Sequence, residues 1–363
     1  MRVALVAPPF IPVPPKVYGG TELFIAHLAE GLSKLGIDVV VYCNGESTVS
    51  VEKRWIYAES QWPIQGEVYA NLKDINHTAW AIRDASSDCD IIHLNNLPGL
   101  ATSRFVSNRF VYTMHHPSEP GLSAFYQFYP EVEYVTISDF QRLRETMPRT
   151  RTIHHGIDLS LYRSQEKKGG YLSFLGRIAP PKGTHLAIEV AKKSGIPLKI
   201  AGEVQPIYRD YFDSEIRPHL DGKFIEYVGE ADLPSKNELL GNSIAMLFPI
   251  QWDEPFGLVM IEAMACGTPV LAMPGGAVQE VVKDGVSGWV CRSTAEMATR
   301  AQEAATTFRP SAVREYVAAE FSLATMVARY AQCYEEVLNL DKEDELRDQH
   351  VRSTRATGTR AAA

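Results

Sequence analysis

The sequence has few cysteines, and their arrangement excludes two common kinds of stabilising framework. Five occur in 363 residues, and no two have the Cys-x-x-Cys spacing of zinc sites and redox motifs. An odd number of scattered thiols also argues against disulfides and is typical of a reducing compartment. We therefore expect a cytoplasmic protein without zinc or disulfide bonds. The five are Cys43, Cys89, Cys266, Cys291 and Cys333.

Long hydrophobic runs and an excess of positive charge are also missing. No stretch of about 18 uncharged apolar residues occurs, so we expect no transmembrane helix. Residues 1–7 are too short for the apolar core of a signal peptide, and we predict that they form a buried strand. The net charge of −8 disfavours nucleic acid as a partner and gives no electrostatic reason to bind an anionic membrane surface.

The Gly-x-Gly-x-x-Gly fingerprint of dinucleotide-binding domains is absent, although the wider pattern of α/β domains is present. Apolar runs alternate with amphipathic segments, which predicts βα units around parallel sheets. At 363 residues, the chain is long for a single domain. A polar, unpatterned stretch at 163–170 is the predicted linker between two α/β domains.

Two glutamates mark the stretch around which the chain is organised. Glu254 precedes a Pro-Phe-Gly step, whereas Glu262 lies in a helix that is apolar on all sides. Glu262 is therefore predicted to be buried, where a carboxylate needs a strong hydrogen-bond partner. Residues 257–259 begin this helix, where free backbone N–H groups and the helix dipole favour an anion. Two carboxylates for hydroxyl groups and a helix end for phosphate together suit a sugar nucleotide.

Two cations occupy one predicted strand-to-helix loop in the second half of the chain. A strand at 171–175 is followed by Arg177 and Lys182, and a helix begins at about Thr184. Both cations can converge on a diphosphate at the carboxyl edge of a parallel sheet. Solvation at the protein surface is the alternative interpretation of such a pair.

The first half offers a glycine pair and a histidine pair. Gly19 and Gly20 stand between the first predicted strand and helix, where the backbone can approach a phosphate or another substrate group closely. A flexible turn is the alternative. His115 and His116 follow a predicted strand, and a histidine there points into the ligand crevice of an open α/β sheet. A satisfied, half-buried histidine is the alternative.

Several of these motifs resemble glycosyltransferase family 4. The similarity is densest in the Glu-x7-Glu stretch, with its Pro-Phe-Gly and Glu-Ala-Met-Ala-Cys-Gly-Thr-Pro-Val flanks, and in the loop from Gly176 to Lys182. The glycine pair, the strand-end histidine and a Thr-Ile-Ser-Asp turn also match. The resemblance implies the GT-B fold, in which two Rossmann-like, doubly wound α/β domains face each other across a cleft. It also implies a C-terminal helix that crosses back to the first domain.

The resemblance implies roles for individual residues. His115 and Glu254 are expected to contact the donor sugar, and Glu262 is expected to hold the ribose of the nucleotide. Arg177 and Lys182 are expected to bind the diphosphate. The predicted catalytic residues are His115, Arg177, Lys182 and Glu254. The predicted donor-binding residues are Gly19, Gly20, Arg177, Lys182, Glu254, Phe256, Gly257, Leu258, Val259 and Glu262.

The implied domain organisation follows the chain. The predicted parts are an acceptor-binding domain at 1–162, a linker at 163–170, a domain for the nucleotide sugar at 171–321, a crossover helix at 322–340 and a disordered tail at 341–363.

The implied activity is retaining transfer of a hexose from a nucleoside-diphosphate sugar to a hydroxyl group of a sugar or small molecule, without a metal cofactor. UDP is the preferred base, with GDP and ADP as alternatives. An epimerase or phosphorylase on the same fold, or a catalytically silent subunit that binds sugar nucleotides, are the competing hypotheses. The acceptor is expected to be selected by loops at 8–18, 44–65 and 115–130, whereas oligomeric state and linkage are not readable.

Two short patterns point elsewhere. Asp88-Cys89-Asp90 matches the Asp-x-Asp metal motif of another glycosyltransferase class, but it precedes a predicted buried strand and we expect no metal there. His155 replaces the asparagine that is usual in family 4, so we assign it no role.

Three further segments carry weaker expectations. The strand ends at 202–203 and 229–230 are expected to line the nucleotide crevice. The glycine pair at 275–276 is expected to allow close approach of backbone to ligand, and Glu280 is expected to be structural rather than catalytic.

Overall fold

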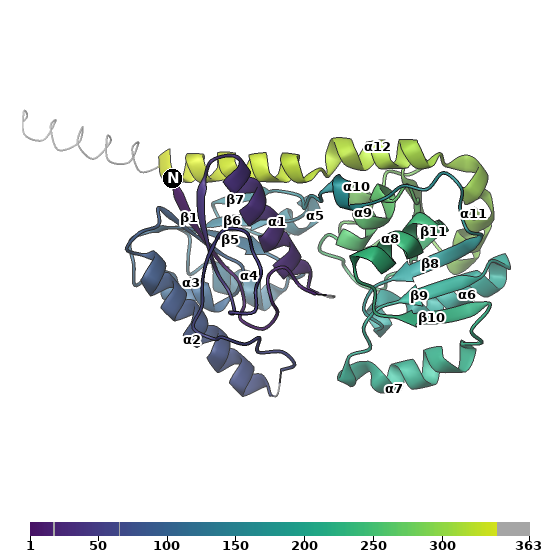
Figure 1. The fold of residues 1–363 in the computed structure, drawn as a ribbon, viewed down its shortest axis with the longest axis horizontal. Helices are drawn as coiled ribbons and strands as arrows, with labels where there is room; N and C mark the ends of the chain where they lie inside the picture. Colours follow the sequence, from purple (N-terminus) through teal and green to yellow (C-terminus); the bar gives the residue numbers. More distant parts are fainter. Residues whose placement is uncertain (17–18, 65, 340–363) are drawn as a thin grey trace, which may run out of the picture.

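The computed structural model describes residues 1–16, 19–64 and 66–339, and it shows two α/β domains side by side (Figure 1). The first is built on a seven-stranded sheet and the second on a six-stranded sheet. Every strand pair in the described residues is parallel. The predicted pair of doubly wound domains is confirmed.

The first domain has the strand order β3-β2-β1-β4-β5-β6-β7. Its strands are β1 (Arg2–Val6), β2 (Asp38–Tyr42), β3 (Glu52–Arg54), β4 (Ile91–Leu94), β5 (Arg109–Met114), β6 (Glu133–Thr136) and β7 (Thr150–Thr152). Its helices are α1 (Gly20–Lys34), α2 (Glu67–Ala85), α3 (Pro98–Ser103), α4 (Pro120–Tyr126) and α5 (Asp139–Arg142).

The second domain repeats this plan with the order β10-β9-β8-β11-β12-β13. Its strands are β8 (Tyr171–Leu175), β9 (Leu198–Ala201), β10 (Ile225–Gly229), β11 (Ser243–Phe248), β12 (Val270–Ala272) and β13 (Gly288–Val290). Its helices are α6 (Thr184–Ser194), α7 (Arg209–Tyr211), α8 (Leu233–Gly241), α9 (Leu258–Ala265), α10 (Val278–Val281), α11 (Thr294–Thr307) and α12 (Pro310–Glu320).

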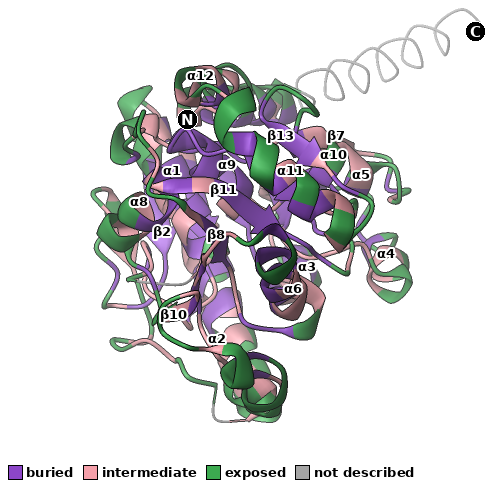
Figure 2. Ribbon diagram, turned by 90° about the vertical axis from the view of Figure 1, so that its right-hand side faces the viewer, coloured by how far each residue is buried: buried purple, intermediate pink, exposed green. Residues whose placement is uncertain are grey.

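The central strands are the continuous apolar runs of the sequence because helices cover both faces of each sheet. Residues 3–6 of β1 and all of β4 are buried. Figure 2 shows the strands buried inside and the exposed residues on the outer faces of the helices. The edge strand β3 lies in the segment 44–65 that the sequence led us to treat as a loop. Its three residues are Glu, Lys and Arg, so no apolar pattern marks it.

The C-terminal helix crosses between the domains as expected. After α12, residues 323–339 are helical and run along the first domain (Figure 1). The side chains of Val327, Tyr330 and Tyr334 are buried in the first domain's core together with residues of β1 and α1. Two hydrogen bonds connect this helix to the first domain. The Tyr334 hydroxyl pairs with Nδ1 of His93 at 2.7 Å, and the Tyr330 hydroxyl pairs with the Thr113 hydroxyl at 2.9 Å. The predicted tail at 341–363 lies outside the described residues.

The strand orders fix where a ligand can bind. In each sheet the order reverses between two central strands, β1 and β4 in the first domain and β8 and β11 in the second. In open α/β sheets, the crevice beyond the carboxyl ends of such strands is the usual ligand site. The loops that follow β1, β5, β8 and β11 carry the residues singled out in the sequence.

Candidate active site

A cavity of about 480 Å³ lies between the two domains. Its wall contains every predicted catalytic and donor-binding residue, although these come from four separate segments. They are Gly19, Gly20, His115, Arg177, Lys182, Glu254, Phe256, Gly257, Leu258, Val259 and Glu262. The structure therefore brings the whole predicted set together, with contributions from both domains.

Two helices begin at this cavity, one from each domain. Helix α1 begins at Gly20 and helix α9 begins at Leu258, and both residues line the cavity. Gly257 precedes α9 with φ of 86°, a left-handed conformation that favours glycine. A Cβ atom on Gly20 would lie 3.6 Å from the Leu258 side chain, so the two helix starts are neighbours. Because the first N–H groups of a helix have no partner within it, the arrangement favours an anion.

The predicted cations lie beside these helix starts. Arg177 follows β8, and Lys182 ends the short turn before α6. The Lys182 Nζ atom lies 2.6 Å from Oε2 of Glu254 and 4.6 Å from the centre of the Trp252 ring. The side chains of this ion pair are largely buried, with exposed fractions of 16% and 9%.

Both predicted glutamates are buried, and each accepts two hydrogen bonds on one of its two carboxylate oxygens. The Trp252 indole donates to Oε2 of Glu254 at 2.8 Å, the same oxygen that Lys182 contacts. Oε1 of Glu262 accepts from the Tyr162 hydroxyl at 2.9 Å and from Lys236 at 3.0 Å. Glu262 thus has the strong partners that its burial requires. Burial and the Glu262 carboxylate raise the pKa of the Tyr162 hydroxyl, which remains a donor.

His115 lines the first-domain side of the cavity as a neutral imidazole. Burial and the neighbouring histidines lower its pKa well below the usual value. Its Nε2 lies 2.9 Å from Oδ1 of Asn95, whose amide nitrogen donates to the Val6 carbonyl at 3.2 Å. The amide oxygen can only accept, so Nε2 carries the proton and Nδ1 is the free acceptor. Its ring stacks on His155 at 5.7 Å between centres, with an interplanar angle of 10°.

Comparison with known proteins assigns the chain to a family. The model of the family described as Glycosyltransferase Family 4 matches residues 18–161, and that described as Glycosyl transferases group 1 matches residues 163–307. The chain belongs to glycosyltransferase family 4.

Two curated relatives show how far the similarity extends. Glycogen synthase of Mycobacterium tuberculosis is 30% identical over 198 residues, which is 50% of this chain and 47% of that protein. The match therefore spans about half the length of that relative. Phosphatidyl-myo-inositol mannosyltransferase of Mycobacterium leprae is 26% identical over 361 residues, which is 91% of this chain and 93% of that protein.

Solved structures match this chain over almost its whole length. AviGT4, a glycosyltransferase involved in avilamycin A biosynthesis, has a TM-score of 0.72 at 25% identity, covering 93% of this chain and 98% of that one. HepE of Anabaena, solved in complex with UDP and glucose, has a TM-score of 0.73 at 17% identity, covering 93% and 100%. These likenesses confirm the GT-B fold. Each helix in the described residues is too short or too polar to cross a membrane.

The cavity wall also contains residues that the family motifs did not reveal. Trp252 and Lys236 hold the two glutamates, and His155 packs edge-on against Phe256 with ring centres 5.2 Å apart. Lys236 lies on α8, where no local pattern distinguishes it from a solvated lysine. His155 was left without a role because it departs from the usual asparagine, yet it lies 4% exposed in the wall.

One expectation about the second domain is wrong, and another stays a prediction. The strand ends at 202–203 and 229–230 are not among the residues that line this cavity between the described parts of the domains. However, Gly202 packs against the backbone of Gly176, which does line it, so contact of these strand ends with a nucleotide stays a prediction. The glycine pair at 275–276 packs under the Glu254 loop instead of facing a ligand. A Cβ atom on Gly275 would lie 2.5 Å from the Trp252 carbonyl oxygen.

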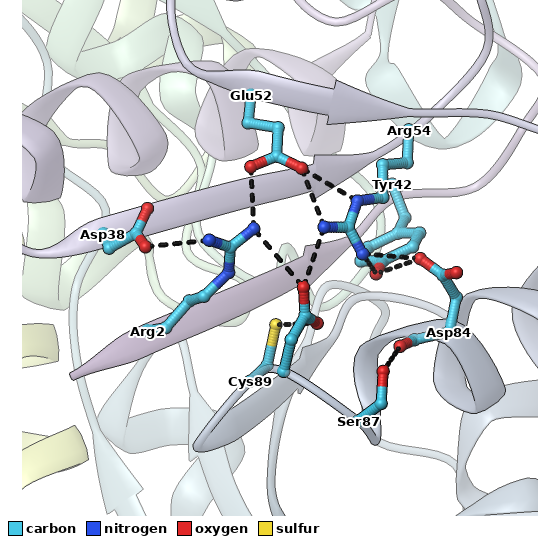
Figure 3. Close-up of polar contacts among 9 residues, drawn as sticks. Arg2, Asp38, Tyr42, Glu52, Arg54, Asp84, Ser87 and Cys89 are labelled. Atoms are coloured by element: carbon cyan, nitrogen blue, oxygen red, sulfur yellow. Dashed lines mark hydrogen bonds and ion pairs between the residues drawn. The ribbon is translucent and has the colours of Figure 1, made fainter.

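The Asp-x-Asp pattern has a structural role. Asp88 forms ion pairs with Arg54 at 2.8 Å and Arg2 at 3.5 Å, in a network that also contains Asp38 and Glu52 (Figure 3). Asp90 accepts a hydrogen bond from the backbone N–H of Arg2 at 2.7 Å. The network ties the starts of β1 and β2 to edge strand β3, and none of these residues lines the cavity.

Proposed function

We propose that the chain is a retaining glycosyltransferase that moves a hexose from a nucleoside-diphosphate sugar to a hydroxyl group of a sugar or small-molecule acceptor. One observation carries the proposal. A single interdomain cavity holds two helix starts and two cations for a diphosphate, and two buried carboxylates for hydroxyl groups. Membership of family 4 supports this choice of substrate class.

The charges in the cavity assign each part of the donor to its own place. The diphosphate lies against Arg177, Lys182 and the N–H groups at the start of α9, because these groups favour negative charge. Both donors to Glu262 use its Oε1 atom, so Oε2 remains as the acceptor for a ribose hydroxyl. Both donors to Glu254 likewise use Oε2, which leaves Oε1 for a hydroxyl of the sugar.

The transfer step proceeds on one face of the sugar. The acceptor hydroxyl attacks the anomeric carbon on the side from which the diphosphate leaves, and a phosphate oxygen of the leaving group takes the hydroxyl proton. Negative charge grows on the diphosphate as its bond to the sugar breaks. Arg177 and Lys182 therefore stabilise the transition state more than the bound donor, which is what accelerates a reaction.

Lys182 changes partner in this scheme. In the structure its ammonium group neutralises Glu254. A bound diphosphate attracts the ammonium group more strongly, and a sugar hydroxyl then replaces it as a donor to Glu254. His115, neutral and with a free acceptor at Nδ1, contacts the sugar from the opposite domain.

We propose that the reaction needs no metal ion, because Arg177, Lys182 and the helix N-termini neutralise the negative charge of the diphosphate, as a divalent ion would. UDP is the preferred donor base, and HepE, which has this fold, was solved with UDP and glucose. We also propose a cytoplasmic location, since all five cysteines are free and buried. The acceptor is proposed to contact the described parts of the loops at 8–16, 44–64 and 115–130.

The test is release of nucleoside diphosphate from a panel of UDP-, GDP- and ADP-sugars, with and without a mixture of sugar and phenolic acceptors, in the presence of EDTA. The proposal predicts release that depends on acceptor and persists with EDTA, and a product with the anomeric configuration of the donor. Conversion of the donor without an acceptor would indicate an epimerase, and dependence on free phosphate would indicate a phosphorylase. Binding without turnover would indicate a silent subunit.

A further inference from the structure

Glu280 of helix α10, in the second domain, reaches across to the first domain outside the cavity. Its carboxylate accepts hydrogen bonds from the backbone N–H groups of Asp139 at 2.7 Å and Phe140 at 2.5 Å. These two residues begin helix α5 of the first domain. Nε2 of His154, also in the first domain, lies 3.1 Å from the same carboxylate. One side chain thus makes three contacts with the opposite domain.

These contacts are partly shielded from water. The side chains of Glu280 and His154 are each 22% exposed. His154 is itself packed between Phe256, with ring centres 6.0 Å apart, and Phe321, at 5.8 Å. Hydrogen bonds from N–H groups to a charged carboxylate are stronger than those between neutral groups, and shielding preserves that strength.

On the first-domain side, helix α5 determines the position of the histidine loop. Gln141 of α5 donates to the carbonyl of His116 at 2.7 Å and to that of Met114 at 3.1 Å. The side-chain oxygen Oε1 of Gln141 accepts from the backbone N–H of Ile137 at 2.9 Å. The amide of Gln141 therefore holds the backbone on both sides of His115, and His115 and Ile137 both line the cavity.

On the second-domain side, helix α10 is locked to the glutamate loop. The backbone N–H of Ala277 donates to the Glu254 carbonyl at 2.8 Å, and that of Gly276 donates to the Asp253 side chain at 3.2 Å. Gly276 has φ of 58°, and a Cβ atom there would lie 2.1 Å from the Glu254 carbonyl oxygen. Only glycine permits this approach, so α10 and Glu254 are held as one unit.

We propose that Glu280 is a positioning residue that sets the spacing between His115 on one wall of the cavity and Glu254 on the other. The connection runs from His115 through Gln141 and α5 to Glu280, and from there through α10 to Glu254. Glu280 touches no ligand in this proposal. Its effect on transfer rests on the proposed function, whereas its effect on domain spacing does not.

A metal site at the same place is a weaker interpretation. Ligand atoms of Asp139, His154 and Glu280 all lie within 4.8 Å of one another. However, both oxygens of Glu280 already accept hydrogen bonds, and Oδ1 of Asp139 accepts from Thr152 at 2.7 Å. The carboxylates are thus satisfied by the chain itself.

The test compares Glu280→Ala with Glu296→Ala. Glu296 is a matched control because its carboxylate also accepts from a backbone N–H, that of Arg292 at 2.8 Å, but within the second domain at the start of α11. Small-angle X-ray scattering of the ligand-free chains reports the domain spacing without any assay of activity. We expect a larger radius of gyration for Glu280→Ala and no change for Glu296→Ala.

Kinetics then separate positioning from binding. The loss of hydrogen bonds to a charged group corresponds to a factor of about ten to a hundred. We expect kcat to fall by about that factor in Glu280→Ala, while the affinity for free nucleoside diphosphate, bound by the second domain, stays within about threefold. Glu280→Gln keeps one acceptor oxygen, so its kcat should lie between those of the wild type and Glu280→Ala. This variant replaces Glu280→Ala in the test if the alanine variant does not fold.

Unchanged scattering in both Glu280 variants would overturn the proposal, whether or not transfer is detected. A wild-type chain that transfers no sugar, combined with a larger radius of gyration in Glu280→Ala, would instead count against the proposed function and leave the positioning role standing.

Discussion

The two domains face the same cavity with different chemistry. The second domain presents fixed charges, with Arg177 and Lys182 in one loop and Glu254 and Glu262 around one helix. The first domain presents the start of α1 and a neutral imidazole, His115, and no charged side chain of the first domain is among the residues that line the cavity in the described structure. Under the proposed function, this difference would let the second domain bind and activate the donor, while the first domain orients the sugar and admits the acceptor.

The largest effect should follow removal of the cations of the second domain. Arg177→Ala combined with Lys182→Ala removes two groups that act on the growing charge of the diphosphate, each comparable to an oxyanion donor worth a factor of about 10²–10³. We expect kcat/KM to fall by at least about 10³ in steady-state assays. A fall of less than tenfold would show that the diphosphate is bound elsewhere.

The next effect concerns the buried pair of Lys236 and Glu262, whose side chains are 18% and 3% exposed. Lys236→Met leaves a buried carboxylate with only the Tyr162 hydroxyl, so unfolding in urea should require about 3 kcal/mol less free energy, the low end for a broken buried pair. Adding Glu262→Gln should recover part of this loss. If the double variant is less stable than Lys236→Met alone, the two residues do not act as a pair.

Acid should destabilise the first domain in particular. Burial lowers the pKa of His93 and His155 to about 3 and that of His77 to about 4. The unfolded chain binds these protons below its ordinary histidine pKa of about 6.5, so stability is fully present above that pH and is lost as pH falls toward the folded values. Each group costs up to about 2 kcal/mol between pH 7 and pH 5, since one pKa unit corresponds to about 1.4 kcal/mol.

One carboxyl group in the same domain opposes this trend. Burial raises the pKa of Glu22 to about 7, so its stabilising contribution grows as pH falls from 7 to 5 and offsets the loss at about one histidine. Urea denaturation at pH 7 and pH 5 measures the sum. Replacing His93 with Phe should flatten the pH dependence by about one proton, and equal stability of the wild type at both pH values would contradict neutral buried histidines.

The smallest effect distinguishes two neighbouring histidines. His115 offers a free acceptor to the cavity, whereas His116 is engaged by Tyr126 at 2.5 Å and by the Pro117 carbonyl at 2.8 Å. His115→Ala should lower kcat by about ten- to a hundredfold, which general positioning effects allow, without changing nucleotide affinity. His116→Ala is the control and should act on stability alone. A greater loss of turnover in the His116 variant would reverse the assignment.

The same contrast explains what could be predicted from the sequence. The charged groups of the second domain are local, because Arg177 and Lys182 share a loop and Glu254 and Glu262 flank one helix start. Their strands are long apolar runs with clear ends. The sequence therefore predicted the central strands of both sheets and the charged residues Arg177, Lys182, Glu254 and Glu262 of the cavity wall.

What was missed depends on contacts between distant segments. Lys236 reaches Glu262 from another helix, and Glu280 reaches α5 from another domain. The glycine pair at 275–276 fits either a ligand or a neighbouring backbone, and only the fold shows that the neighbour is the Glu254 loop. Strand β3 was missed because three charged residues at a sheet edge carry no apolar pattern.

The central claim is that the second domain holds a nucleoside diphosphate at Arg177 and Lys182. The most direct measurement is thermal stability with UDP, GDP, ADP and NAD in excess, for the wild type and for the variant that lacks both cations. A ligand at about 100 times its dissociation constant adds about 2.7 kcal/mol to the folded state, enough to raise the melting temperature measurably. The account predicts stabilisation of the wild type by one nucleoside diphosphate and none of the variant. Stabilisation by NAD alone, or equal stabilisation of both proteins, would contradict it.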